Sequence, residues 1–141
     1  MTKLEVSLDI IVHATEDLEK FLKSFEEMFG LKEEDFIISN VEGHFENPIT
    51  IIRAKLTKKS ANQFLEEFLK KLSVNQKEEI RQEIEERTEN STLHIRFDKQ
   101  EFIEGRIDFL EKEAIKLKIQ TPIYNKKDTV KVFSKILENV N

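Results

Sequence analysis

STLHIRFDKQEFIEG, residues 91–105, is the stretch on which the fold prediction rests. Three apolar residues alternate in it with three ionisable residues, which predicts a β-strand that buries one face and exposes the other. The apolar residues are Leu93, Ile95 and Phe97, and the ionisable residues are His94, Arg96 and Asp98. Lys99 and Gln100 follow at the end of this strand. The stretch therefore predicts a polar contact surface on a sheet and not a catalytic centre.

The periodicity of the remaining chain predicts further strands and amphipathic helices. Strands are expected at 4–12, 36–41, 49–56, 106–110 and 114–120, and helices at 18–29, at 61–72, after Asn75 and at 130–140. The last two strands are expected to form a closing hairpin. The pattern predicts a single α+β domain over residues 1–141, with a mixed or antiparallel sheet of about six strands and helices packed mainly on one face. The expected order is β-α-β-β-α-α-β-β-β-α.

The composition excludes several kinds of site. The sequence has no cysteine, which excludes disulfides, thiolate zinc sites and thiol nucleophiles. The three histidines, His13, His44 and His94, are scattered, and three glycines are too few for a phosphate-binding loop, so no metal or cofactor site is predicted. No apolar run reaches membrane-spanning length, and the first residues alternate between polar and apolar. A cytoplasmic protein that is not exported is therefore expected.

The charge is distributed unevenly along the chain. A net charge of −5 argues against a protein that coats nucleic acid by charge alone. Residues 1–90 have 13 basic and 20 acidic side chains, however, whereas residues 91–141 have 10 basic and 8 acidic ones. A polyanion would therefore bind to the C-terminal third. Alternatively, the charged residues, which make up 36% of the chain, only solvate helix faces.

Basic residues of the C-terminal strands are candidate phosphate ligands. The candidates are Arg96, Lys99, Lys116 and Lys118, with His94 adding a ring. Phe97, Phe102 and Phe109 are better placed for burial, so base stacking on the sheet is not predicted. A salt-bridged sheet face, with Glu5 and Asp9 opposite basic partners, explains the same residues. The residues alone leave both interpretations open.

Histidine and carboxylate pairs offer a second kind of chemistry. His13 with Glu16, or His94 with Asp98, could perform general acid–base catalysis if a substrate lay beside them. Helix capping by Glu16 and cross-strand pairing by Asp98 explain the same residues more simply. The prediction is therefore that the protein is not an enzyme, with a metal-dependent phosphodiester hydrolase as the least favoured alternative.

Three stretches together resemble an archaeal family of small proteins described as RNA-binding and as predicted exosome subunits. They are HATED at 13–17, EGHFENPI at 42–49, and LHIRFDKQ at 93–100 followed by Gly105. The resemblance covers essentially the whole chain and implies a fold similar to the large-subunit ribosomal protein that binds 5S ribosomal RNA. The residues that match the family pattern are His13, Thr15, Glu16, Gly43, His44, Asn47, Pro48, Arg96, Asp98, Lys99 and Gln100. The sequence departs from the pattern at Glu46, where the family usually has glycine.

The resemblance and the basic C-terminal third together predict a non-enzymatic RNA-binding accessory protein, associated with RNA processing or the exosome. The expected RNA contacts are Arg96, Lys99, Gln100, His44, Asn47, His94, Lys116 and Lys118. A structural role is expected for His13, Thr15, Glu16, Gly43, Pro48, Asp98 and Gly105. The alternative is a protein–protein interaction module in an RNA-processing assembly, which would use the acidic part of the chain or a free sheet edge. A homodimer is compatible with either function.

Overall fold

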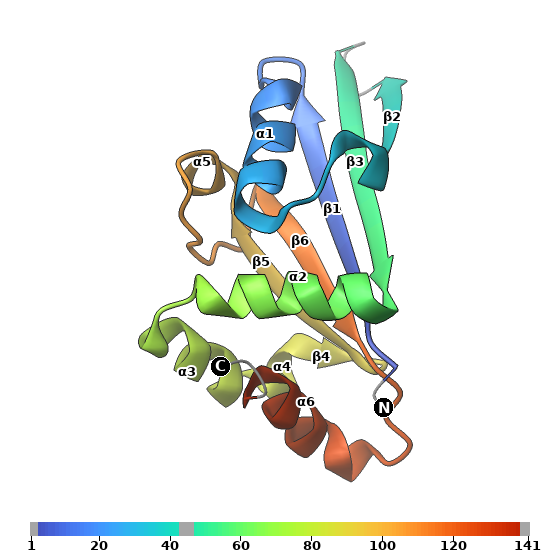
Figure 1. The fold of residues 1–141 in the computed structure, drawn as a ribbon, viewed down its shortest axis with the longest axis vertical. Helices are drawn as coiled ribbons and strands as arrows, with labels where there is room; N and C mark the ends of the chain where they lie inside the picture. Colours follow the sequence, from blue (N-terminus) through green and yellow to red (C-terminus); the bar gives the residue numbers. More distant parts are fainter. Residues whose placement is uncertain (1–2, 43–46, 139–141) are drawn as a thin grey trace. The chain divides into compact units, whose positions relative to one another are not determined.

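The computed structural model describes residues 3–42 and 47–138, and its strands form one antiparallel sheet with the order β2-β3-β1-β6-β5-β4 (Figure 1). The strands are β1 (Glu5–His13), β2 (Ile37–Glu42), β3 (Pro48–Thr57), β4 (Thr88–Glu89), β5 (Thr92–Asp98) and β6 (Ala114–Gln120). The α-helices are α1 (Leu18–Phe29), α2 (Lys58–Lys70), α3 (Val74–Gln82), α4 (Ile84–Arg87), α5 (Lys99–Ile103) and α6 (Thr129–Glu138), and the 3-10 turns are η1 (Glu33–Asp35) and η3 (Lys126–Asp128). The predicted α+β class and six-stranded sheet are confirmed. Within the described ranges, no helix is long and apolar enough to cross a membrane.

The chain divides into two compact units, and the long strands contribute residues to both. Unit 1 comprises Met1–Val6, Leu56–Ile95 and Lys118–Asn141. Unit 2 comprises Ser7–Lys55 and Arg96–Leu117. Each unit is described by itself below.

Unit 2 has an aromatic core. The ring of Phe25 on α1 lies 4.6 Å from the ring of Phe102 on α5 and 4.9 Å from that of Phe36, measured between centroids. The ring of Phe97 on β5 packs edge-on against Phe102 at 5.6 Å. All four rings are buried, so they hold α1 and α5 against the strands of this unit.

Unit 1 has its own apolar core. Phe64 and Phe68 on α2 stack with their ring centroids 6.0 Å apart. Ile80 and Ile84, the two regular apolar positions in an otherwise polar stretch, are both buried, on α3 and α4. Helix α6 contacts both of these short helices and buries Phe133. These contacts explain why a polar sequence forms helices here, because only one narrow apolar stripe is needed.

The structure identifies the cap residues of two helices, of which α1 spans the predicted residues 18–29 and α3 begins slightly before its predicted start. Helix α1 is capped by Asp17, whose Oδ1 accepts a hydrogen bond from the backbone N of Glu19 at 3.0 Å. Helix α3 is capped by Ser73, which forms a reciprocal capping box with Gln76, and not by Asn75. In both cases several cap-forming residues lie close together in the sequence, so the pattern alone does not select one.

The segment after β5 also differs from its prediction. Residues 99–103 form helix α5, for which no helix is predicted, because the Asp98 carboxylate accepts a hydrogen bond from the backbone N of Gln100 at 3.0 Å and so caps a helix. The predicted strand at 106–110 reduces to one isolated bridge between Phe109 and Phe97 of β5. The closing hairpin is therefore wrong, although β6 itself is confirmed. Gly105, with a φ of +84°, reverses the chain after α5.

Candidate nucleic-acid interface

The outward side chains of β1, β3, β5 and β6 in unit 2 form a polar surface, which we call the strand face. Buried and solvent-reaching residues alternate along each of these strands, so one set of side chains points away from the aromatic core. The charged residues of the strand face are Asp9, Arg53, Lys55, Arg96, Asp98 and Lys116. Four of these six are basic, although the whole chain has a net charge of −5.

Two of the basic side chains of the strand face already have acidic neighbours. Arg53 Nε donates to Asp9 Oδ1 at 3.1 Å, yet the Arg53 side chain is still 66% exposed. Arg96 Nη1 lies 3.5 Å from Glu111 Oε2, and both side chains are exposed. Pairs with this exposure hold their partners weakly, so both guanidinium groups are free to exchange a carboxylate for a phosphate. Lys116 is exposed and has no ion-pair partner among the described residues.

Lys99 lies in a different setting from the other basic candidates. It is 4% exposed, and its Nζ donates to the backbone O of Ile11 at 2.8 Å and to Glu16 Oε1 at 2.9 Å. Glu113 Oε2 lies 3.5 Å from the same ammonium group. Because its hydrogen bonds go to these internal acceptors, Lys99 joins α5 to the end of β1 and to the turn before α1. We call Lys99, Glu16, His13 and Glu113 the Lys99 cluster.

His13 completes the Lys99 cluster on its exposed side. Its backbone N donates to Glu16 Oε1 at 2.9 Å, and its ring Nε2 donates to Glu113 Oε2 at 3.1 Å. The imidazole therefore pairs with Glu113 and not with Glu16, the partner considered from the sequence. Glu113 has a φ of +53°, an unusual value for a residue with a side chain, so this contact is made from a strained backbone position.

The pKa of Glu113 lies below its ordinary value of 4.5, mainly because of the hydrogen bond from His13 and then because of the positive charge of Lys99. We predict that His13→Ala raises this pKa towards 4.5, as measured by NMR titration of the carboxyl carbon. Because folding depresses the pKa, the contribution of Glu113 to stability is present above the unfolded pKa and is lost as the pH falls through the folded pKa. Arg96→Ala is the control and should leave the titration unchanged. An unaltered Glu113 pKa in His13→Ala would contradict this assignment.

The remaining predicted RNA contacts lie in several places. Gln100 is exposed on α5, and Asn47 is exposed immediately before β3, both in unit 2. His94 on β5 and Lys118 on β6 belong to unit 1 and are partly exposed. His44 lies outside the described residues. The structure thus brings Arg96 and Lys116 together on strands of unit 2 and separates Lys99 from them by burial.

The residues expected to have structural roles also have distinct positions. Glu16 and His13 belong to the Lys99 cluster, Asp98 caps α5, and Pro48 is the first residue of β3, where its missing N–H is tolerated. Thr15 is exposed in the turn before α1, and Gly43 lies outside the described residues.

Sequence analysis missed two basic residues of the strand face. Arg53 and Lys55 alternate with buried Ile52, Ala54 and Leu56 in β3. The same alternation that identified Arg96 was therefore present in the sequence IIRAKLT at 51–57. The net negative charge of residues 1–90 gives no indication of these two basic residues, because the net charge of a long segment does not report the charge of one sheet face.

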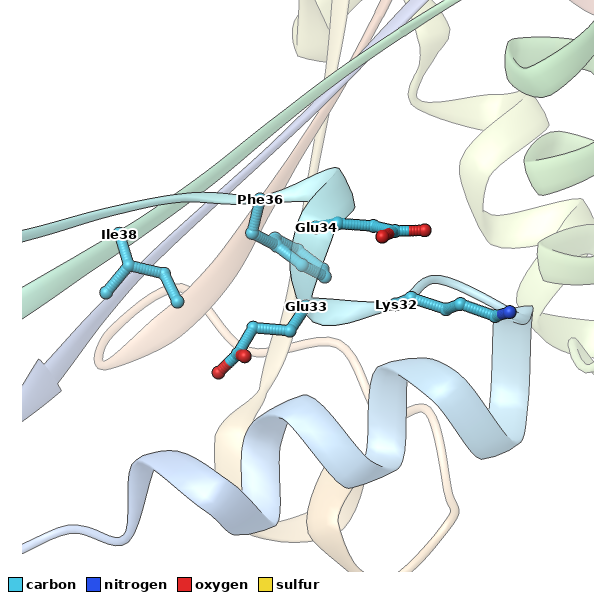
Figure 2. A pocket seen from close by; sticks show the side chains of 5 residues that line it. All are labelled: Lys32, Glu33, Glu34, Phe36 and Ile38. Atoms are coloured by element: carbon cyan, nitrogen blue, oxygen red, sulfur yellow. The ribbon is translucent and has the colours of Figure 1, made fainter.

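A hollow of about 410 Å³ lies at η1 and the start of β2 in unit 2, lined by Lys32, Glu33, Glu34, Phe36 and Ile38. Figure 2 shows that Glu33 and Glu34 point to different sides of η1, so their carboxylates do not converge on one point. Two carboxylates and one lysine give this hollow an acidic lining, which is unsuited to a phosphate. A larger hollow, of about 1130 Å³, lies in unit 1 between the start of β1 and the first turns of α2.

The fold and the strand face define the class of protein: an α+β protein whose sheet presents a largely basic set of side chains. A family model described as RNA binding matches residues 5–121, and the chain belongs to this RNA-binding family. The RNA-binding protein PAB1135 of Pyrococcus abyssi is 30% identical over 142 residues, which cover 94% of this chain and 92% of that protein. Two solved structures of relatives have the same fold. Protein AF2318 from Archaeglobus fulgidus (29% identity, TM-score 0.78) covers 97% of this chain and 99% of its own, and Mth689, a DUF54 protein from Methanothermobacter thermautotrophicus (29% identity, TM-score 0.73), covers 98% and 100%.

Proposed function

We propose that the strand face of unit 2 binds the phosphate backbone of RNA and that the protein acts as a non-enzymatic accessory to RNA-processing reactions. The observation that supports this most is the presence of four basic side chains on β3, β5 and β6 of a chain with a net charge of −5. Membership of an RNA-binding family supports the same ligand. The cytoplasmic location expected from the sequence stays a prediction.

Three of the four basic residues of the strand face have a defined part in this proposal. Arg53 and Arg96 offer planar guanidinium groups that bind phosphate oxygens through two N–H groups at once. Lys116 offers a positive point charge on β6, which lies next to the β5 strand of Arg96. Ile11, which is 42% exposed on β1, supplies apolar contact with sugar rings. Gln100 and Asn47 are exposed in the same unit and donate hydrogen bonds to sugars or base edges.

The side chains of the strand face favour base-paired RNA, bound through its phosphates, over single-stranded RNA, bound by stacking of its bases on the protein. None of the outward residues described on β1, β3, β5 and β6 of unit 2 is Phe, Tyr or Trp, and the imidazole of His13 is paired with Glu113. Stacking of unpaired bases depends on aromatic rings. Binding by phosphate contacts gives modest sequence preference and strong salt dependence. Lys99 has a structural part in this proposal, because its ammonium group is already satisfied inside the protein.

The proposed function is tested by measuring the affinity of the full chain for a base-paired RNA hairpin over a range of salt concentrations. Three or four phosphate contacts predict a slope of log K against log salt of about −3. A slope near zero, or no binding at low salt, would reject phosphate recognition by this protein.

A second candidate function, protein–protein interaction, is favoured by one observation. β2 lies at an edge of the sheet, and its Ile37 is 73% exposed, with Val41 also exposed. An edge strand with apolar side chains can pair with a strand of another chain, which would attach the protein to an RNA-processing assembly such as the exosome or to a second copy of itself. Partners that the wild type retains after nuclease treatment, and that Ile37→Lys loses, would support this role. Loss of every partner with the nuclease would reject it.

A further inference from the structure

We infer that a second nucleic-acid surface lies on the segment that follows β6 and includes the first turns of α6 in unit 1, where Tyr124 stacks on an unpaired RNA base and neighbouring lysines bind the flanking phosphates. We call this segment, residues 122–135, the Tyr124 segment. It lies beyond residues 5–121, which the family model matches, and it shares only the class of ligand with the proposed function.

The exposure of Tyr124 is the first observation. Its side chain is 96% exposed, whereas Phe64, Phe68 and Phe133 in the same unit are buried. Tyr124 is the only aromatic residue classed as exposed among residues 3–42 and 47–138. A tyrosine ring is flat, has few rotatable bonds and has a face on which any base can stack.

The charge around Tyr124 is the second observation. Lys126, Lys127, Lys131 and Lys135 follow within eleven residues, and Asp128 is the only acidic residue among them. All four lysines are exposed, and none has an ion-pair partner within the described part of the chain. Lys131 and Lys135 are one helical turn apart on α6, so they lie on the same side of the helix. An exposed ring with unpaired lysines beside it matches a single strand of RNA, which offers bases and phosphates alternately.

The anchoring of the Tyr124 segment is the third observation. At its start, the buried Thr121 donates its backbone N–H to the carbonyl O of Ser91 at 3.3 Å. In its middle, the Asn125 side chain accepts from the backbone N of Lys127 at 3.1 Å, and the Thr129 hydroxyl donates to the carbonyl O of Lys126 at 2.9 Å. At its end, Phe133 is buried. A segment held at these points has already lost much of its backbone freedom, which lowers the entropic cost of binding.

Intrinsic fluorescence gives a direct test, because the sequence has one tyrosine and no tryptophan. A short oligouridine added to the full-length wild type should quench the tyrosine emission, whereas an RNA duplex should quench it much less, since its bases are already stacked. Free tyrosine amide, titrated in parallel, corrects for absorption by the RNA.

Three variants complete the test, with affinity for labelled oligouridine as the readout. Tyr124→Ala should weaken binding by roughly tenfold, and Tyr124→Phe should keep most of the affinity because it keeps the ring. Lys126→Gln with Lys127→Gln should reduce the salt slope by about 1.4. All of these side chains are exposed, so the melting temperature should not change.

Unchanged tyrosine emission at saturating oligouridine, or equal affinity of Tyr124→Ala and the wild type, would overturn this inference, and a protein would then be the better candidate ligand for the segment. Either result would leave hairpin binding by the strand face standing. Conversely, quenching by oligouridine together with no hairpin binding would support RNA binding by the Tyr124 segment and reject RNA binding by the strand face.

Discussion

Replacing Lys99 with alanine is expected to lower the free energy of unfolding by about 2–4 kcal/mol. The substitution removes an ammonium group that is 4% exposed and leaves the carboxylate of Glu16 and the carbonyl O of Ile11 without their shared donor. Glu16 Oε1 keeps the hydrogen bond from the backbone N of His13, but its negative charge loses the ammonium group that compensates it. Removing one partner of a buried ion pair costs more than the pair itself contributes, because the remaining charge has lost its water. Urea unfolding followed by circular dichroism measures the effect.

Two further variants separate charge from packing in this prediction. Lys99→Met keeps most of the apolar side chain but removes the ammonium group, with its charge and its N–H donors, so most of the loss should remain. Lys116→Ala removes an exposed lysine of the same unit and should change stability by less than about 0.5 kcal/mol. If Lys99→Ala were as stable as Lys116→Ala, the Lys99 cluster would not be the internal link described here.

Reversing two charges of the strand face, with Arg53→Glu and Lys116→Glu in one protein, is expected to weaken binding of an RNA hairpin on the order of a hundredfold at low salt. The change removes two phosphate contacts and puts two carboxylates in their place. The slope of log K against log salt should fall in magnitude by about 1.8. Fluorescence anisotropy of a labelled hairpin measures both quantities.

The matched control carries the same change of charge on a helix of the same unit. Lys20→Glu with Lys23→Glu alters two exposed lysines of α1, so the net charge of the protein changes equally. This control should lose only the small part of the affinity that depends on net charge. Equal losses in the two proteins would show that the RNA responds to total charge and not to the strand face.

The sequence predicted the sheet well where a local pattern decides the structure. Alternation identified β1, β5 and β6, and it correctly placed Arg96 and Lys116 on the outward side of their strands. It applied equally to β3, where Arg53 and Lys55 follow the same rule. Side-chain direction in a strand depends only on the residue's own position along the chain, so one sequence suffices to predict it.

The position of Lys99 could not be predicted in the same way. Its hydrogen-bond partners Glu16 and Ile11 lie 83 and 88 residues away in the sequence, and no local pattern reports such a contact. No helix is predicted for the largely polar sequence DKQEFIEG at 98–105, although Asp98 caps a helix there and Phe102 enters the core. Burial of a lysine is rare enough that only the three-dimensional arrangement of its acceptors reveals it.

The most direct test of RNA binding by the strand face is an NMR titration of the full-length protein with a base-paired RNA hairpin. The backbone amide signals of residues 51–55 in β3 and 114–117 in β6, and the side-chain Nε signals of Arg53 and Arg96, should shift with added RNA. The amide signals of α1, residues 18–29, should stay in place. Shifts confined to α1, with unmoved signals from β3 and β6, would contradict the proposal that the strand face binds RNA.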